Sequence, residues 1–194
     1  MKKEIKIKTR DSLLKAALRV FTEKGYRGAS IREIAEEAKT TKPAIYYYFG
    51  SKALLYRLLL EESLKEINSL LQEIADSNAG PREKILRLVK LHLDLCRRRP
   101  ENIRLVLVNF YRFDDELPEI ELEEHILRML KITAGVIREG IEKKLLLRLD
   151  PMELSLQLMG MIHVQVLAMI KGKNLVPVSR AETIVKTFIE GAGR

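Results

Sequence analysis

This chain of 194 residues has a single cysteine, Cys96, and no tryptophan. One cysteine excludes an intrachain disulfide framework and any zinc site built from several cysteines. Only 10 glycines and 6 prolines occur, which argues against a turn-rich all-β fold and for long helices. Hydrophobic residues make up 46% of the chain, so it has enough apolar side chains to build a globular core.

The chain also has few of the hydrophobic runs that mark secreted and membrane proteins. Its basic start, MKKEIKIK, is not followed by the apolar segment of a secretory signal. The longest apolar stretches are interrupted by Glu, Gln, His or Lys, so no membrane-spanning segment is expected. These observations predict a cytoplasmic protein without a membrane partner.

Positive charge is concentrated in the first third of the chain. Residues 1–60 hold 14 Lys and Arg against 6 Asp and Glu, whereas residues 61–194 hold 21 of each. The net charge of +8 therefore lies entirely in the N-terminal part. A basic head on a neutral body points to a polyanion as the partner of the head, either nucleic acid or an anionic membrane.

Nearly every segment has the 3.6-residue periodicity of an α-helix, and no segment favours a strand. Gly25 suits the end of the first helix, while Ser30 and Glu33 form a capping-box pattern at the start of the second. The predicted fold class is all-α with about nine helices, near residues 9–24, 31–38, 42–49, 51–77, 81–99, 101–112, 119–148, 151–171 and 181–191.

Two short helices joined by about three residues, preceded by a longer helix, form the pattern of a helix-turn-helix. In the second short helix Ile45 and Phe49 face inward, while Lys42, Ala44 and three consecutive tyrosines lie outward or to the sides. Lysine neutralises phosphate or reaches guanine, and tyrosine hydroxyls bind phosphate oxygens. Three consecutive tyrosines span about 200° of a helix, so they cannot all be buried. The pattern favours DNA contact over a core aromatic cluster.

Residues from about 9 to 55 resemble the DNA-binding domain of the tetracycline-repressor (TetR) family of bacterial regulators. The resemblance rests on FTEKGY at 21–26, IREIA at 31–35 and TKPAIYYYF at 41–49, in that order and at these spacings. One departure is Lys39, which stands where the family usually has a turn glycine. A non-glycine residue with positive φ costs on the order of 1 kcal/mol, although Lys39 would add a cation near the DNA.

The resemblance implies a DNA-binding domain over residues 1–52 and a helical dimerisation and effector-binding domain over residues 53–194. It implies phosphate contacts for Ser30 and Lys52, each in the first turn or at the cap of a helix. It places the remaining DNA contacts on the third helix, at Thr41, Lys42, Pro43, Ala44, Tyr46, Tyr47 and Tyr48.

The helix over 151–171 has too many apolar faces for a surface helix. By the resemblance, this helix and the last one pair across a two-fold axis to make a homodimer. A central helix buried within its own protomer is the alternative. The residues expected at the dimer interface are Met159, Ile162, Val166, Ile184 and Phe188.

The C-terminal two thirds also contain candidates for an effector pocket, although ordinary core packing explains each of them as well. A metal site would need more ligands at closer spacing, so neither a metal nor another cofactor is expected. No cluster of Lys or Arg falls on an inward face, which favours a largely hydrophobic ligand. The candidate pocket residues are His92, Cys96, Phe110, Phe113, Met129 and His163.

Together these patterns predict a DNA-binding transcription regulator, a repressor released from a palindromic operator by a small hydrophobic effector. The alternative is a ligand-independent architectural DNA-binding protein of the same fold. An enzyme is not expected, because the sequence places no convergent acid, base and nucleophile. A membrane-surface module is disfavoured, because the head lacks a basic amphipathic helix with large exposed apolar residues.

Overall fold

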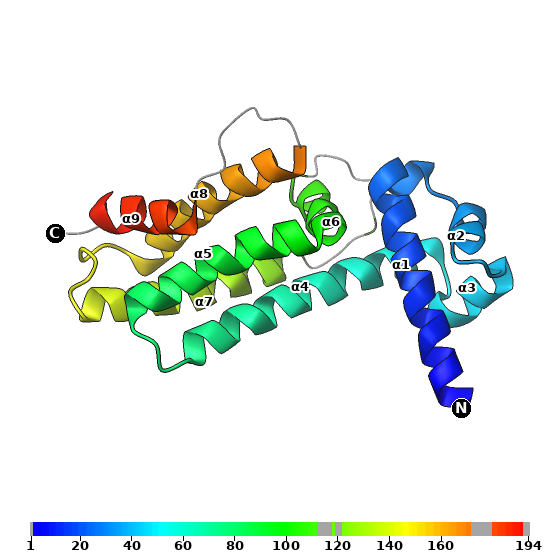
Figure 1. The fold of residues 1–194 in the computed structure, drawn as a ribbon, viewed down its shortest axis with the longest axis horizontal. Coiled ribbons are helices and arrows are strands. Elements are labelled where there is room, and N and C mark those ends of the chain that lie inside the picture. The colour runs from blue at the N-terminus through cyan, green and yellow to red at the C-terminus, as the bar shows by residue number, and fades with distance from the viewer. Residues whose placement is uncertain (1, 112–117, 119–121, 172–179, 192–194) are drawn as a thin grey trace. The chain divides into compact units, whose positions relative to one another are not determined.

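A computed structural model describes residues 2–111, 118, 122–171 and 180–191 of the chain. Within these ranges the chain forms nine α-helices and no strand (Figure 1), which confirms the predicted all-α class. The helices are α1 (Lys2–Gly28), α2 (Ile31–Glu37), α3 (Lys42–Phe49), α4 (Lys52–Asp76), α5 (Pro81–Arg98), α6 (Pro100–Phe110), α7 (Leu122–Glu142), α8 (Pro151–Lys171) and α9 (Ala181–Gly191).

The chain divides into two compact units. The first comprises Met1–Leu64 and Glu101–Glu121, and the second comprises Lys65–Pro100 and Leu122–Arg194. The division falls within α4, whose first half belongs to the first unit and whose second half belongs to the second. The unit that contains α1, α2 and α3 therefore includes more of the chain than residues 1–52.

In the first unit, α2 packs against α1, and α3 packs against α2 (Figure 1). The core between these helices is closed by the ring of Tyr56 from α4, which is 1% exposed. Its centroid lies 5.0 Å from the Phe21 ring and 5.0 Å from the Tyr26 ring, both in edge-to-face arrangements. Asn109 of α6 donates a hydrogen bond of 2.7 Å to the Tyr56 hydroxyl, so α6 is tied to this aromatic core.

Helix α1 is interrupted at Gly25, which has φ 71° and ψ 172°. This conformation is essentially restricted to glycine. The break allows Tyr26 to fold back, so that its ring stacks on Phe21 with centroids 6.1 Å apart. The helix was predicted to end at Gly25; the structure has a break there, and α1 continues to Gly28. The start of the helix lies earlier than predicted, at Lys2.

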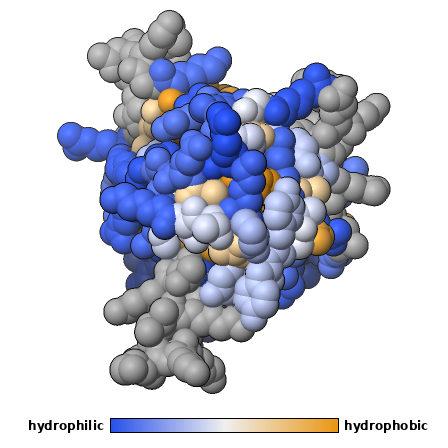
Figure 2. All heavy atoms as spheres, turned by 90° about the vertical axis from the view of Figure 1, so that its right-hand side faces the viewer, coloured by the Kyte–Doolittle hydropathy of each residue, from blue (hydrophilic) through white to orange (hydrophobic). Residues whose placement is uncertain are grey.

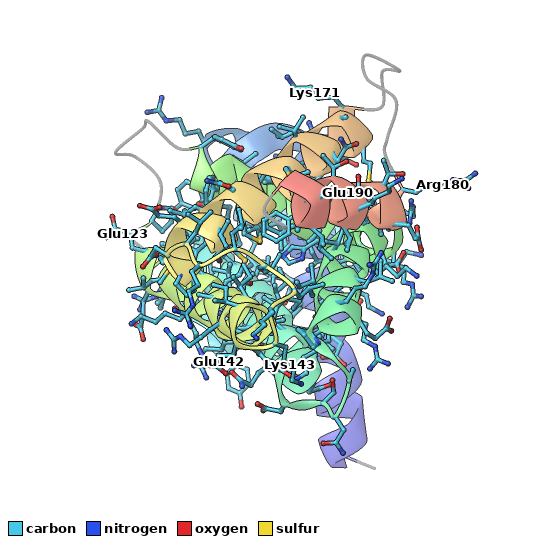
Figure 3. All side chains as sticks on the ribbon, turned by 90° about the vertical axis from the view of Figure 1, so that its left-hand side faces the viewer. Glu123, Glu142, Lys143, Lys171, Arg180 and Glu190 are labelled. Carbon is cyan, nitrogen blue, oxygen red and sulfur yellow. The ribbon has the colours of Figure 1, made fainter. Side chains whose placement is uncertain are left out.

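The second unit is a bundle in which α5 packs against α7, α8 and α9, and α7 packs against α8. Seen along this bundle in Figure 3, labelled charged side chains such as Glu123, Lys171 and Arg180 lie at the periphery. Asp150 caps α8 as its spacing predicted, since it accepts from the backbone N–H groups of Met152 and Glu153 at 2.8 and 3.0 Å.

Helix α7 ends earlier than the apolar periodicity predicted. Its last residue is Glu142 rather than a residue near 148, and Lys144 has a left-handed φ of 59°. The N–H of Leu145 donates to the Gly140 carbonyl at 2.8 Å, as in a Schellman motif. Leu146, only 2% exposed, then packs into the core from outside the helix, which explains why its spacing imitated a helical position.

Candidate nucleic-acid interface

Helix α3 directs its polar and aromatic side chains away from the core. Ile45 and Phe49 are 0% and 6% exposed and anchor the helix, which confirms their predicted inward position. Tyr46 and Tyr47 are 51% and 71% exposed. Tyr48 is half-buried, and its ring lies edge-on to Tyr47 with centroids 5.3 Å apart. The three tyrosines thus offer two exposed rings, and the half-buried ring of Tyr48 packs against that of Tyr47.

The first turn of α3 presents small and charged groups to the surface. Thr41 is the N-cap residue, and its side chain makes no capping hydrogen bond. Lys42 and Pro43 are exposed and Ala44 is half-buried, with Pro43 in the first turn as predicted. A hydroxyl, an ammonium group and small apolar atoms at a helix N-terminus are the groups that read base edges in a major groove.

The cations on this surface differ in whether an acid neutralises them. Arg10 pairs with Glu62 at 2.8 Å, and Arg19 pairs with Glu37 at 2.5 Å. Among the residues that the structure describes, Lys39 and Lys42 have no acidic partner. The face that includes α2 and α3 is mostly hydrophilic, with only small apolar areas (Figure 2). The cations left for a polyanion therefore include Lys39 in the turn between α2 and α3 and Lys42 in the first turn of α3.

Ser30 forms the capping box that its spacing predicted. Its Oγ accepts from the Glu33 N–H at 3.2 Å, and its own N–H donates to Glu33 Oε2 at 2.9 Å. Lys24 Nζ lies 2.5 Å from the other Glu33 carboxylate oxygen. Hydrogen bonds from Lys24 and then from Ser30 lower the pKa of Glu33 to about 2. The Ser30 hydroxyl also donates to Glu33 at 2.7 Å, so a phosphate would compete with this bond.

Lys52 lies in the first turn of α4 with its ammonium group held against an aromatic ring. Its Nζ is 4.4 Å from the centroid of Tyr26, which is a cation–π contact. Burial lowers the pKa of Lys52, while the negative charge of Glu33 acts in the opposite direction. Nothing in the sequence spacing indicated this contact, because the break at Gly25 and the fold of the unit bring Tyr26 to Lys52.

The turn between α2 and α3 keeps a left-handed residue although it lacks the usual glycine. Lys39 has φ 51° and an exposed side chain. The N–H of Thr40 donates to the Ala35 carbonyl at 2.9 Å, and that of Lys39 donates to Glu36 at 3.1 Å. These are the bonds of a Schellman motif, with lysine in the position that glycine prefers. The turn geometry is thus retained.

Gly50 connects α3 to α4 through a tight turn that the sequence motifs did not single out. It has φ 75° and ψ −52°, and the Ser51 N–H donates to the Phe49 carbonyl at 2.9 Å. These values describe a γ-turn with positive φ, a strained conformation. A Cβ at this position would lie 3.2 Å from Leu54 Cδ1. The only sequence feature that could have indicated this turn is a single glycine, Gly50, between two segments of helical periodicity.

In the second unit, α5 and α8 bring together three of the predicted pocket residues. The Cys96 thiol lies 3.9 Å from the carbonyl oxygen of Val166, and His163 is close enough for its charge to act on His92. Burial lowers the pKa of both histidines and raises the pKa of Cys96. Met129 is half-buried on α7, Phe110 belongs to the first unit, and Phe113 lies outside the described residues.

Two grooves of the second unit are lined by residues other than the predicted pocket candidates. One, of about 460 Å³, lies between the starts of α5 and α9 and the turn that follows α7. The other, of about 480 Å³, lies between the second half of α4 and α7. Within the described residues, no three His, Cys, Asp or Glu side chains are grouped as metal ligands would be.

The structure assigns the five predicted dimer-interface residues to the core of the single protomer. Each is at most 4% exposed, so none is available at the surface of the folded chain; they are Met159, Ile162, Val166, Ile184 and Phe188. The exposed apolar residues of α8 are instead Leu156 and Val164, at 55% and 56%, with exposed Gly160 between them. Their spacing of four places these three residues on one stripe of the helix.

Helix α8 is also long and apolar enough, by length and composition alone, to cross a membrane, contrary to the expectation from the sequence. Its most apolar window has a mean hydropathy of 1.4, and 33% of that window is buried. The core helix of a soluble protein has the same composition. Here the buried side of α8 packs on α5 and α7, and Ser155 donates to the Leu130 carbonyl at 3.1 Å.

Residues 13–59 match the family of bacterial regulatory proteins named tetR. A solved transcriptional regulator of the TetR/AcrR family from Thermobifida fusca is 26% identical, with a TM-score of 0.70 over 95% of this chain and 98% of that chain. This chain belongs to the TetR family. The matched segment includes every predicted DNA-contact residue from Ser30 to Lys52.

The TetR-family chain is 35% identical over 99 residues to the HTH-type transcriptional repressor NicS of Pseudomonas putida. That match covers 51% of this chain and 47% of the repressor, so the chain spans about half the length of curated relatives such as this one. The structure of FadR from Bacillus subtilis in complex with stearoyl-CoA shares the fold, with 21% identity and a TM-score of 0.77 over 94% of this chain and 98% of that chain.

Proposed function

We propose that this TetR-family chain is a cytoplasmic DNA-binding transcription regulator that represses by occupying a palindromic operator. The observation that carries the proposal is the surface of α3, where exposed Tyr46 and Tyr47 lie beside the unpaired cations of Lys39 and Lys42. Such a surface combines phosphate neutralisation with groups that read base edges.

The residues of this surface have distinct roles in the proposed complex. Lys42, Pro43 and Ala44 approach base edges in the major groove, because they form the first turn of α3. Tyr46, Tyr47 and Tyr48 contact the backbone and bases, while Thr41 and Lys52 bind phosphates. Ser30 contributes through its helix start, since its hydroxyl is already engaged by Glu33.

A homodimer positions two such surfaces on one operator. The stripe of Leu156, Gly160 and Val164 on α8 supports this assembly, because it leaves apolar area uncovered on a helix that packs on its other side. A Cβ at Gly160 would meet nothing within 4 Å, so a partner helix can approach closely there. The two-fold axis would set the half-sites about 34–36 Å apart, one turn of DNA.

The effector in this proposal is a largely hydrophobic small molecule bound in the second unit. The bound stearoyl-CoA of the FadR structure, which shares this fold, supports a ligand with a long apolar chain. The effector releases DNA because it binds one conformation of the regulator better than the DNA-bound one, which couples the two sites.

The DNA part of the proposal is tested by selecting preferred sequences from a random duplex library and measuring affinity against salt. We expect an enriched palindrome and an affinity that falls with a log–log slope of about −0.9 per phosphate neutralised. Lys42→Ala should change the preferred bases, whereas Lys52→Ala should weaken all sequences and reduce the slope by about one per subunit. Salt-independent binding would contradict phosphate neutralisation at this surface. Binding with no preferred sequence would contradict operator recognition and favour the architectural alternative.

The effector part is tested by a thermal-shift screen of the free protein, followed by DNA-release measurements for each stabilising compound. The screen includes fatty acids, fatty alcohols, fatty amides and acyl-CoA. Stabilisation and DNA release by apolar compounds are expected. If only polyanions without an acyl chain stabilise the protein and displace DNA, the hydrophobic effector is refuted while DNA binding stands.

A further inference from the structure

One half-buried histidine in the second unit has a buried ring nitrogen without a hydrogen-bond partner among the described residues. His92 lies on α5, and its Nδ1 is 2.8 Å from the backbone carbonyl oxygen of Leu88. A carbonyl oxygen can only accept, so Nδ1 must carry the proton and donate it. A neutral imidazole has a single ring proton, and the other ring atom, Nε2, is then left with a lone pair that can only accept.

The environment keeps this histidine neutral. Burial lowers the pKa of His92, the hydrogen bond to the Leu88 carbonyl acts in the opposite direction, and the neighbouring His163 lowers the pKa further. The Nε2 atom exposes less than 1 Å² and has no hydrogen-bond partner among the described residues. Such an acceptor is rare in folded proteins, because leaving it unsatisfied is unfavourable.

One turn on either side of His92 along α5, Leu88 and Cys96 are buried and uncharged. Cys96 lies one turn further along α5 and is joined to α8 through the Val166 carbonyl. An apolar setting with one unsatisfied acceptor is the composition of a ligand site with a single orienting group.

We propose that the effector presents an N–H or O–H donor to Nε2 of His92, and that ligands offering only acceptors there, such as carboxylates and esters, are selected against. This inference rests on the proposed effector-binding function and specifies the chemical class of the effector. A carboxylate would place its lone pairs against the lone pair of Nε2, and a neutral imidazole provides no positive charge to compensate.

The test uses four compounds with the same ten-carbon chain: decanol, decanamide, methyl decanoate and sodium decanoate. Dissociation constants for the full-length protein are measured at neutral pH, together with DNA release. Decanol and decanamide should bind about fivefold to tenfold more tightly than the ester and the carboxylate, as one hydrogen bond in a buried site provides. His92→Leu should remove this preference, and His125→Leu, the same change elsewhere in the unit, should retain it.

A second measurement avoids dependence on the folding of a variant. Long-range proton–nitrogen NMR correlations of the wild-type histidines should identify Nε2 of His92 as the unprotonated nitrogen, and its resonance should move when decanamide is added. Protonation at Nε2, or tighter binding of decanoate than of decanamide, would overturn the inference. If compounds release DNA without any head-group preference, only this inference fails. If no apolar compound binds, the proposed effector function fails with it.

Discussion

At the scale of single residues, the contact between Tyr26 and Lys52 is the least expected part of the candidate interface. To bind a phosphate as proposed, Lys52 has to keep its ammonium group charged and correctly directed, although burial lowers its pKa. The Tyr26 ring, 4.4 Å away, supplies an attractive surface that holds the group in place. In the proposed complex Tyr26 is therefore a positioning residue, which acts on DNA only through Lys52.

Replacing Tyr26 with leucine should weaken binding to every DNA sequence by about twofold to fivefold, the range of an exposed cation–π contact. The salt slope should fall as it does in Lys52→Ala, and the double variant should bind no worse than Lys52→Ala alone. Fluorescence anisotropy over a salt series measures both quantities, with Tyr26→Phe as the control that keeps the ring. Additive losses in the double variant would contradict the positioning role.

Glu33 gives the first unit a specific dependence on acid. Its pKa in the folded protein is about 2, below the ordinary value of 4.5, because Lys24 and Ser30 donate to it. A depressed folded pKa adds stability that is present above 4.5 and is lost as the pH falls toward 2. Urea unfolding at several pH values should show this loss, and Glu33→Gln should reduce its pH dependence. The exposed Glu36→Gln variant of the same helix should retain it; equal curves for both variants would contradict the prediction.

At the scale of secondary-structure elements, Lys39 in the turn after α2 has a strained backbone conformation and a proposed contact with DNA. Lys39→Gly should raise the free energy of unfolding by up to about 1 kcal/mol, because glycine adopts positive φ without strain. The greater conformational entropy that glycine gives the unfolded chain reduces this gain. The same change removes an unpaired cation beside α3 and should weaken DNA binding.

Lys144→Gly is the matched control, because Lys144 has φ 59° in the corresponding turn after α7. It should also stabilise the protein, as measured by urea unfolding, but should leave DNA affinity unchanged. A Lys39→Gly variant with lower stability would contradict the predicted strain at Lys39. A variant with undiminished DNA affinity would contradict its predicted DNA contact.

The helix boundaries that were predicted correctly are those set by contacts between residues close in the sequence. The caps of α2 and α8 were predictable, because Ser30, Glu33 and Asp150 make their bonds within a single turn. The inward positions on α3 followed from helical spacing. The early end of α7 did not, since buried Leu146 preserves the apolar period after the helix has ended.

Contacts between elements were beyond the reach of the sequence alone. The pairing of Tyr26 with Lys52 depends on the fold of the first unit, and the γ-turn at Gly50 depends on how α3 joins α4. For α8, an apolar composition nearly all round the helix does not distinguish the side that packs on its own protomer. The three interface candidates on α8, Met159, Ile162 and Val166, therefore lie on its buried side, while Leu156 and Val164 lie on the exposed side.

At the scale of the whole molecule, this distinction makes the proposed dimer testable. Val164→Glu should dissociate the dimer into folded monomers, because it places an unpaired charge in the interface at a penalty of several kcal/mol. Ile184→Glu should instead unfold the chain, since Ile184 is 3% exposed within the protomer. Sedimentation and circular dichroism separate these two outcomes.

Ser69→Glu adds the same charge at an exposed position of α4. This variant should remain dimeric and serves as the control. A wild-type chain that sediments as a stable monomer would contradict the dimer. Co-sedimentation of that monomer with lipid vesicles would assign the stripe on α8 to a membrane surface.

The buried thiol of Cys96 makes the protein well suited to site-specific labelling. Its side chain is 3% exposed and burial raises its pKa, so little reactive thiolate is available. A cysteine introduced at Lys15, an exposed position on α1, would then react with a spin label without background from the native thiol. In a symmetric dimer one such substitution gives a pair of probes, and pulsed electron resonance would read their separation directly as operator and ligand are added in turn.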